Sequence, residues 1–513
     1  MLDDGIFFWI YNGHGAIQTL CGEGMHSRSD INSMYNKRWP VLFAATCSFS
    51  QWDGNDTSGA ETLAFNANGG AIATLSATRK VFVSHNNSIL SALGYRLLHR
   101  DSDGKFKRLG DYFRDTKNID SLRSTTGMSR TKLCYVLLGD PAMRLTTPSP
   151  KVTLETIDGD DFLSGDCVLM ARQRARLAGT VYGTDGEPLD DFNGTLAVTI
   201  YDSEYSTTSS GLEVDETGGR SITFEEMGNK LYSGRGTVKN GRFEIDVVMP
   251  SEIADNWRPA TINFYAKADD GREAMGNSRD FHVFGYDENA EPDTTAPVID
   301  YAYLNHSSFT NGSVVNEEPM FLAGVSDDVS INMSTASIGH QMMLKLDDSR
   351  SYNDVSLYYT PAADGSPSGT VSYPMSELSP GNHTLTFRVW DTDGNSTSHT
   401  LSFFVEVGAA PQIFDIFTDA NPATTHANFY ISHNRPDANA EVTLEIYSIA
   451  GRRVWTSKVE GRSDMFLSTP IQWNLCDMGG ARVGRGIYIY RATIKIDGHE
   501  LQTSAKRIAV TGN

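Results

Sequence analysis

The stretch GIFFWIYNGHG, residues 5–15, decides the fold of the N-terminal part of this chain. An unbroken apolar run stops at Asn12, and His14 follows between two glycines. A continuous apolar run of this kind is typical of a parallel strand that is covered on both faces. The stretch therefore predicts a buried strand with an imidazole at its carboxyl end.

Three more apolar runs of the same kind follow along the chain. They are WPVLFAAT, GAIATLSAT and LCYVLLGD, at residues 39–46, 70–78 and 133–140. Residues 59–68 and 84–101 lie between these runs and show helical periodicity, with Ile89, Leu93 and Leu97 on one stripe. Apolar strands that alternate with helices predict a doubly wound α/β unit with parallel strands.

The length, charge and cysteine content limit the possible fold and function of the whole chain. It has 513 residues, which is too many for one compact core. With 43 Lys and Arg against 64 Asp and Glu, the net charge of −21 argues against a nucleic-acid partner. The five cysteines show no CxxC spacing, so they predict neither a disulfide framework nor a zinc site. No apolar run approaches the ~20 residues of a membrane span.

The sequence texture changes at about residue 147. Helical periodicity gives way to short alternating strands that are separated by Gly, Asp and Asn turns, as in a β-sandwich. The acidic, proline-containing stretch at residues 287–300 predicts a linker, and GAAPQI at residues 408–413 predicts another break. In the last segment, residues 442–456 and 485–500 predict hairpins with glycine at the turn. We expect a partial α/β domain at 1–146 and β-sandwich domains at 147–288, 289–408 and 409–513.

Two reactive side chains follow neighbouring apolar runs. His14 and Cys47 are 33 residues apart (47 − 14), enough for one crossover connection and a return. Functional groups of doubly wound sheets gather beyond the carboxyl ends of the strands. A thiol beside an imidazole is a nucleophile with its own base. The backbone N–H groups of Gly15 and Cys47 are the predicted oxyanion donors, since the glycines leave the backbone accessible.

Other residues have competing interpretations. Cys21, in a glycine-rich loop, is the rival nucleophile, whereas Cys134, Cys167 and Cys476 read as structural or incidental. The residues after the cysteine either shape a pocket, bind a cation or form a solvated loop: Trp52, Asp53, Asp56 and Glu61. Asp140 favours a structural turn over catalysis, because the Asp-Pro step ends its strand.

Four motifs together resemble the gingipain-type (C25) cysteine peptidases, which have a caspase-like α/β fold. They are YNGHG, LFAATCSF, GAIATLSATR and YVLLGDPAMRL, and they occur here in the family's order. The resemblance implies that His14 and Cys47 are the catalytic dyad. It also implies an immunoglobulin-like β domain after the peptidase domain, consistent with the sequence from Lys151 onward.

The C-terminal segment carries a second resemblance. The stretches at residues 421–456 and 484–494 are similar to the C-terminal signal domain of type IX secretion cargo in Bacteroidetes. Both features together, with an extra β domain, resemble the C-terminal portion of the type IX secretion sortases. That resemblance implies a cysteine transpeptidase that cleaves the signal domain from cargo and transfers the cargo to anionic lipopolysaccharide. It also implies a site at the cell surface, in association with an outer-membrane barrel protein.

Members of the peptidase family have further strands and a catalytic carboxylate upstream of the GHG segment. We therefore expect this chain to be part of a longer protein, or a truncated one, and to be inactive without the missing part. A secreted gingipain-like endopeptidase and a non-enzymatic surface protein are the alternatives.

The acidic turns of the β region leave one further question open. Asp327, Asp328, Asp391 and Asp393 lie in turn-like positions. Such turns either bind calcium or are ordinary solvated turns, which are the commoner case. We expect no cofactor and no metal in the peptidase site.

Overall fold

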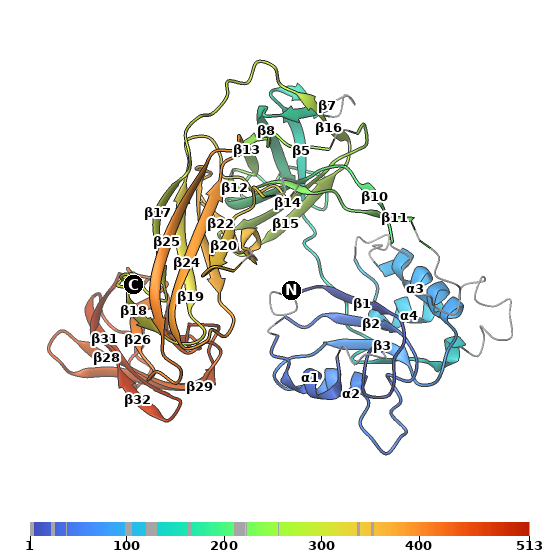
Figure 1. Cartoon of the computed structure of the whole chain (residues 1–513). Helices are drawn as coiled ribbons and strands as arrows, with labels where there is room; N and C mark the ends of the chain where they lie inside the picture. Colours follow the sequence, from blue (N-terminus) through green and yellow to red (C-terminus); the bar gives the residue numbers. More distant parts are fainter. Residues whose placement is uncertain are drawn as a thin grey trace. The chain divides into compact units, whose positions relative to one another are not determined.

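The computed structural model divides into two compact units, Met1–Ser149 and Pro150–Asn513 (Figure 1). The residues that it describes are 5–21, 26–36, 38–97, 105–118, 131–162, 167–209, 221, 223–254, 256–335, 339–349 and 353–511. Strands dominate, and the α-helices lie in the first unit. The chain is thus mostly β, with an α/β beginning.

The first unit is built on a four-stranded sheet of order β1-β2-β3-β4. Its strands are β1 (Phe8–Asn12), β2 (Val41–Ala45), β3 (Ala73–Ala77) and β4 (Tyr135–Leu138). The first three are parallel, and every residue of β2 and β3 is buried. This is the burial that the apolar runs predict for strands covered on both faces. The same prediction is wrong for β1, which ends the strand order and has no buried residue, with Ile10 54% exposed.

Helices cover the two faces of this sheet (Figure 1). They are α1 (Arg28–Ser33), α2 (Gly59–Phe65), α3 (Val83–Leu97) and α4 (Leu109–Lys117). Leu42 and Ala44 of β2 join the cluster that contains residues of α1 and α2. Val41 and Phe43 join the cluster that contains residues of α3 and α4. Alternate residues of one strand therefore serve two helical layers, since successive side chains point to opposite faces.

Strand β4 corrects one expectation. It pairs antiparallel to β3, with Thr74 opposite Leu138 and Ala77 opposite Tyr135, whereas its apolar sequence predicted a parallel strand. An apolar run reports burial and carries no information on strand direction. Both helices predicted at 59–68 and 84–101 are confirmed as α2 and α3, and Ile89 and Leu93 of the predicted stripe are buried. Residues 98–101 of the second prediction and the Leu97 side chain of its stripe lie outside the described residues. Helices α1 and α4 were not predicted.

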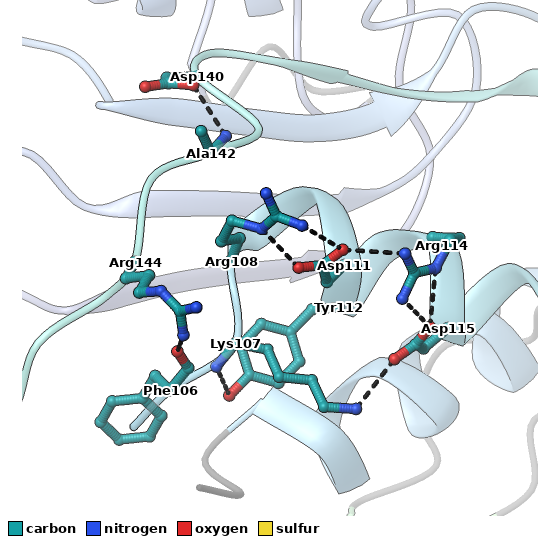
Figure 2. Close-up of polar contacts among 10 residues, drawn as sticks. All are labelled: Phe106, Lys107, Arg108, Asp111, Tyr112, Arg114, Asp115, Asp140, Ala142 and Arg144. Atoms are coloured by element: carbon teal, nitrogen blue, oxygen red, sulfur yellow. Dashed lines mark hydrogen bonds and ion pairs between the residues drawn. The ribbon is translucent and has the colours of Figure 1, made fainter. Parts of the chain in front are cut away.

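Helix α4 is held by polar side chains at its start and along its exposed face (Figure 2). Arg108, at the N-cap, donates from Nε to Asp111 in the first turn at 2.7 Å. Lys107 donates its backbone N–H to the Tyr112 hydroxyl at 3.2 Å and its ammonium group to Asp115 at 3.0 Å. These contacts fix the segment that leads into α4.

The second unit begins with an eight-stranded sheet of order β15-β14-β9-β12-β13-β8-β5-β6. Its strands are β5 (Lys151–Ile157), β6 (Asp160–Asp161), β8 (Arg174–Tyr182), β9 (Gly194–Tyr201), β12 (Lys230–Lys239), β13 (Arg242–Val248), β14 (Thr261–Ala268) and β15 (Glu273–Ser278). A parallel pairing of Met275 with Lys151 joins β15 back to β5. The sheet therefore closes on itself around one apolar core, where the sequence predicted two separate sheets.

Two short strand pairs accompany this closed sheet. They are β7 (Cys167–Ala171) with β16 (Phe281–Tyr286), and β10 (Tyr205–Thr208) with β11 (Thr223–Glu226). The predicted linker at 287–300 has no strand before Val298, where β17 begins. The last residues of that stretch therefore belong to a strand.

Two sheets around one core follow the linker. One contains β17 (Val298–Leu304), β19 (Met320–Ser326), β22 (Tyr359–Pro361) and β23 (Ser368–Pro374). The other contains β18 (Ser313–Val315), β20 (Met343–Leu346), β21 (Asn353–Asp354), β24 (Gly381–Trp390) and β25 (Ser396–Val405). A short 3-10 helix, Ser356–Tyr358, precedes β22.

Two more sheets enclose a third core at the C-terminal end. One contains β26 (Ile413–Thr418), β27 (Ala427–His433) and β30 (Ile471–Trp473). The other contains β28 (Asn439–Ser448), β29 (Arg453–Arg462), β31 (Gly486–Ile496), β32 (His499–Gln502) and β33 (Lys506–Val510). The predicted hairpins are confirmed as β28–β29 and β31–β32, with Gly451 and Gly498 at positive φ in their turns. The domain boundaries at 288 and 408 stay predictions.

Candidate active site

The register of β1 and β2 determines how His14 and Cys47 are related. Phe8 lies opposite Val41 and Asn12 lies opposite Ala45, which is the same sequence offset that separates His14 from Cys47. The Gly13 N–H donates to the Ala45 carbonyl at 3.3 Å, so the pairing continues past the last strand residue. Because neighbouring strands lie about 4.8 Å apart, the two residues leave the sheet side by side at its carboxyl edge.

The backbone of His14 is fixed while its side chain is exposed. Its carbonyl accepts a hydrogen bond from the Tyr11 hydroxyl at 2.6 Å and another from the Cys21 N–H at 2.8 Å. Within the described part of the chain, the imidazole forms no hydrogen bond, and none joins it to the Cys47 thiol. The ring is therefore available to a substrate or to the thiol.

Gly15 is a glycine because the chain has no room for a side chain there. A Cβ at this position would lie 2.4 Å from Oγ1 of Thr46, the residue before the cysteine. Thr46 is fully buried, and its Oγ1 has no hydrogen-bond partner among the described residues. The histidine loop thus packs directly on the cysteine turn, with the glycine backbone as the contact surface.

Cys47 is half-buried in a sharp turn after β2. The next residue, Ser48, has a left-handed φ of 54°, and its N–H donates to the Arg79 carbonyl at 3.2 Å. Sγ of Cys47 lies 3.5 Å from the N–H nitrogen of Val81 and 3.6 Å from the Val81 carbonyl oxygen. The sulfur is therefore held against the segment that follows β3.

Two main-chain N–H groups, one in the histidine loop and one in the cysteine turn, are unused. In the described ranges, neither Gly15 nor Cys47 donates a backbone hydrogen bond, whereas the neighbouring amides of Ala16, Thr46 and Ser48 all do. These are the two donors that the sequence predicted for an oxyanion, and an unused N–H at a strand end is what such a role requires.

Ionisable neighbours define the electrostatics around the cysteine. Arg79 and Asp53 form a two-pronged ion pair, and this contact lowers the pKa of Asp53 and raises that of Arg79. Burial raises the pKa of Tyr135, and the nearby thiols of Cys47 and Cys134 add to the shift. The Tyr135 hydroxyl stays neutral and donates to Asn86 at 2.8 Å.

The other residues predicted near the site have different fates. Glu61 belongs to a capping box at the start of α2, where its carboxylate accepts from the Ser58 N–H at 2.9 Å. Trp52 and Asp56 are exposed in the loop after the cysteine. Cys21 lies in the histidine loop with a φ of 67°, and none of the five cysteines, all of which lie in the described ranges, forms a disulfide. Of these side chains, Asp53 alone is paired with a group beside Cys47.

Asp140 has a structural contact (Figure 2). Its Oδ1 accepts a hydrogen bond from the Ala142 N–H at 2.8 Å, which closes the turn after β4. The turn leads to Arg144, which donates to the Phe106 carbonyl at 2.6 Å. The structural role that the Asp-Pro step favoured is consistent with these contacts.

The acidic turns of the second unit are divided between two arrangements. Asp327 and Asp328 join Asp293 of the predicted linker, and these three carboxylates place oxygen atoms within 4.8 Å of one another. Burial raises the pKa of Asp327 to about 6, and the charges of Asp391 and Asp293 add to the shift. No sequence pattern pointed to Asp293.

Asp391 and Asp393 serve hydrogen bonds within the fold. Oδ1 of Asp391 accepts from three consecutive backbone N–H groups, of Asp393, Gly394 and Asn395, at 2.6–2.9 Å. Oδ1 of Asp393 pairs with Nε of Arg172 at 2.7 Å, and both side chains are largely buried. Calcium binding at these turns stays a prediction. Among the acidic turns, the three grouped carboxylates of Asp293, Asp327 and Asp328 are the set that fits a calcium ion.

The N-terminal part of the chain matches a known family of enzymes over most of its first unit. Residues 1–146 match the model of peptidase family C25. The match covers the whole of the β1–β4 sheet and both His14 and Cys47. No match is found among curated proteins.

Several solved structures are similar to the chain. The structure of dimeric latent PorU from Porphyromonas gingivalis is 28% identical, with a TM-score of 0.35, and the match covers 87% of this chain and 41% of that one. The Arg-specific cysteine proteinase gingipain R (RgpB) is 14% identical, with a TM-score of 0.27, over 55% of this chain and 54% of that one. The complex of P. gingivalis RgpB pro- and mature domains is also 14% identical, with a TM-score of 0.26 and 55% of each chain covered.

The chain spans well under two thirds of the length of these structures. None of its described helices is long and apolar enough to cross a membrane.

Sequence reasoning missed two parts of the site. Arg79 follows the third apolar run, and its pairing with Asp53 required the two loops to be adjacent in space. The second missed part is the Val81 main chain. It contacts the sulfur through backbone groups, which no side-chain pattern in the sequence reveals. A polar residue at the end of a third parallel strand was the available signal for Arg79.

Proposed function

We propose that the first unit carries a cysteine-peptidase centre in which Cys47 is the nucleophile and His14 is its general base. One observation carries the proposal: the β1–β2 register puts an exposed imidazole and a half-buried thiol at matching positions on one sheet edge. The C25 match over residues 1–146 supports the same chemistry.

In the first step, the Cys47 sulfur attacks the carbonyl carbon of the scissile peptide, and its proton passes to His14. The carbonyl oxygen gains a negative charge, which the Gly15 and Cys47 N–H groups stabilise. The C–N bond then breaks, and His14 returns the proton to the departing amine. The product is a thioester between the new C-terminal acyl group and Cys47.

The fate of the thioester separates a peptidase from a transpeptidase. Attack by water releases an acid, whereas attack by an amine forms a new amide and regenerates the thiol. We propose the amine route, with cargo proteins of type IX secretion as acyl donors and an amine of anionic lipopolysaccharide as the acceptor. The resemblance of the C-terminal segment to type IX signal domains supports this assignment.

The location and partners follow from the same resemblance. We propose that the protein is exported to the cell surface of a Bacteroidetes bacterium, where it associates with an outer-membrane barrel protein of the secretion system. Its substrates are then the C-terminal signal domains of other cargo. We further propose that residues 147–288, 289–408 and 409–513 act as three β domains that present the peptidase unit to these partners.

Acylation of Cys47 tests the catalytic part. In a protein that also carries the upstream strands expected from the family resemblance, p-nitrophenyl acetate is expected to give a burst of p-nitrophenolate and an acetyl group on Cys47, located by peptide mass spectrometry. Cys47→Ala should abolish the burst, and His14→Ala should reduce it by about 10²-fold or more. Cys21→Ala is the matched control and should keep the parent rate. Acetylation spread equally over the five cysteines would refute the assignment.

The fate of the acyl group tests the transferase part. Adding an amine such as glycinamide should divert the thioester into an amide product in competition with water. A product that is always the free acid would favour the secreted endopeptidase instead. Retention of residues 413–513 in the native protein, measured by mass spectrometry, favours the sortase, and their removal favours the endopeptidase. A chain whose Cys47 resists every acylating probe would be a non-enzymatic surface protein.

A further inference from the structure

The segment between β3 and α3 lies directly against the candidate nucleophile. Sγ of Cys47 lies 3.5 Å from the Val81 nitrogen, at a distance and angle that fit an N–H···S hydrogen bond to this large atom. The same sulfur lies 3.6 Å from the Val81 carbonyl, to which a neutral S–H can donate. One peptide residue therefore offers the sulfur both a donor and an acceptor.

Several contacts hold this segment in place. The Ser50 N–H donates to the Ala77 carbonyl at 3.0 Å, and the Ser48 N–H donates to the Arg79 carbonyl at 3.2 Å. On the opposite side, the Thr78 N–H donates to the Cys134 carbonyl at 2.8 Å. The segment is therefore held up to Arg79 by main-chain contacts, and the Val81 side chain packs against the apolar cluster of Ala77, Ile89 and Tyr135.

Ionisation of the thiol changes the balance of these two contacts. The neutral thiol uses both, because S–H donates to the carbonyl while the sulfur accepts from the N–H. The thiolate loses the first contact, but its hydrogen bond from the N–H becomes charge-assisted and about twice as strong. A donor aimed at the sulfur therefore stabilises the thiolate over the neutral thiol. Helix α3 begins two residues later, and its positive end acts in the same direction.

We propose that the Val81 main-chain N–H is the positioning group that holds the Cys47 sulfur and stabilises its thiolate. The proposal rests on the function proposed above and adds a third element to the site, because the group comes from the segment after β3. His14 removes the proton, and the Val81 N–H keeps the resulting thiolate at the sheet edge.

Other ionisable groups lie on the segments that adjoin Cys47 in the fold. They are His14, Asp53, Arg79, Lys80, His85, Cys134 and Tyr135. The test leaves all of them unchanged, so that a shift in the thiol's titration belongs to the amide.

The experiment compares Val81→Pro, which removes the N–H, with Val81→Ala, which keeps it. The rate of Cys47 alkylation by iodoacetamide is measured between pH 4 and pH 10 on the full chain and is assigned to Cys47 by peptide mass spectrometry. Val81→Ala should follow the parent curve. Val81→Pro should move its midpoint up by about one pH unit, so that alkylation at pH 6 is about tenfold slower.

Circular dichroism and thermal unfolding show whether the proline variant folds. If it does not, an amide-to-ester replacement at residue 81, made with the α-hydroxy analogue of valine, removes the same N–H without a ring and should give the same shift. A folded variant without the N–H that keeps the parent midpoint would overturn the proposal. Alkylation needs no peptidase turnover, so a shifted midpoint in a chain that never forms an acyl-enzyme would sink the proposed function alone.

Discussion

Replacing Gly15 by alanine is expected to separate the two halves of the candidate active site without unfolding the unit. The new Cβ would lie 2.4 Å from Oγ1 of Thr46, 3.1 Å from its Cγ2 and 3.3 Å from the Thr19 carbonyl oxygen. Ordinary contacts of a Cβ begin at about 3.4 Å, so the histidine loop and the cysteine turn must part by about 1 Å. Thr46 cannot yield by rotating into solvent, because its side chain is fully buried.

The size of the effect follows from this displacement. A 1 Å misplacement in a catalytic arrangement costs about 10²-fold in rate, which equals about 2.7 kcal/mol of transition-state stabilisation. Overpacking of this kind costs about 1–3 kcal/mol of folding free energy, so most molecules stay folded. We therefore expect a loss of about 10²-fold in the rate of Cys47 acylation, with a modest loss of stability.

The p-nitrophenyl acetate burst measures the acylation rate, and urea unfolding measures the stability. Thr46→Ala removes both side-chain atoms that a Cβ at residue 15 would strike. The Gly15→Ala, Thr46→Ala double variant should therefore be acylated at least tenfold faster than the Gly15→Ala single variant. Thr46→Ala alone should be close to the parent, since the hydroxyl that it removes has no partner among the described residues. A Gly15→Ala chain that acylates at the parent rate, or a double variant as slow as the single one, would refute the reasoning.

Three further predictions concern stability. The raised pKa of Asp327, about 6, means that its contribution to folding is fully present below pH 4 and is lost as the pH rises through 6. In EDTA at pH 7.5, the free energy of unfolding of Asp327→Asn should therefore exceed that of the parent by about 1 kcal/mol, after allowance for solvent screening. At pH 4 thermal unfolding should show no difference between the two. Added Ca²⁺ should stabilise the parent and not the variant. Arg172→Ala should cost about 3 kcal/mol in urea unfolding, because Asp393 keeps its buried charge, whereas Arg176→Ala at an exposed pair should cost under about 1 kcal/mol. Ser58→Ala removes the side-chain cap of α2 and should lower the free energy of unfolding by about 1 kcal/mol. Equal stability of parent and variant would contradict this prediction.

The sequence by itself determined the local elements and the two candidate reactive residues. Residues 5–15 were enough to predict a strand with His14 just beyond its end, but the predicted burial is wrong, because β1 ends the strand order and none of its residues is buried. Gly451 and Gly498 marked their hairpin turns, since a tight turn there needs a positive φ. Each of these features depends only on residues within one short segment of the chain.

The tertiary structure alone decided which segments meet. The antiparallel direction of β4, the closure of β15 onto β5 and the grouping of Asp293 with Asp327 each join residues far apart in the sequence. The contact of Cys47 with the Val81 main chain is of the same kind, and it involves a backbone group that every residue except proline possesses. Periodicity reports how deeply a segment is buried, but its partner and direction depend on long-range packing.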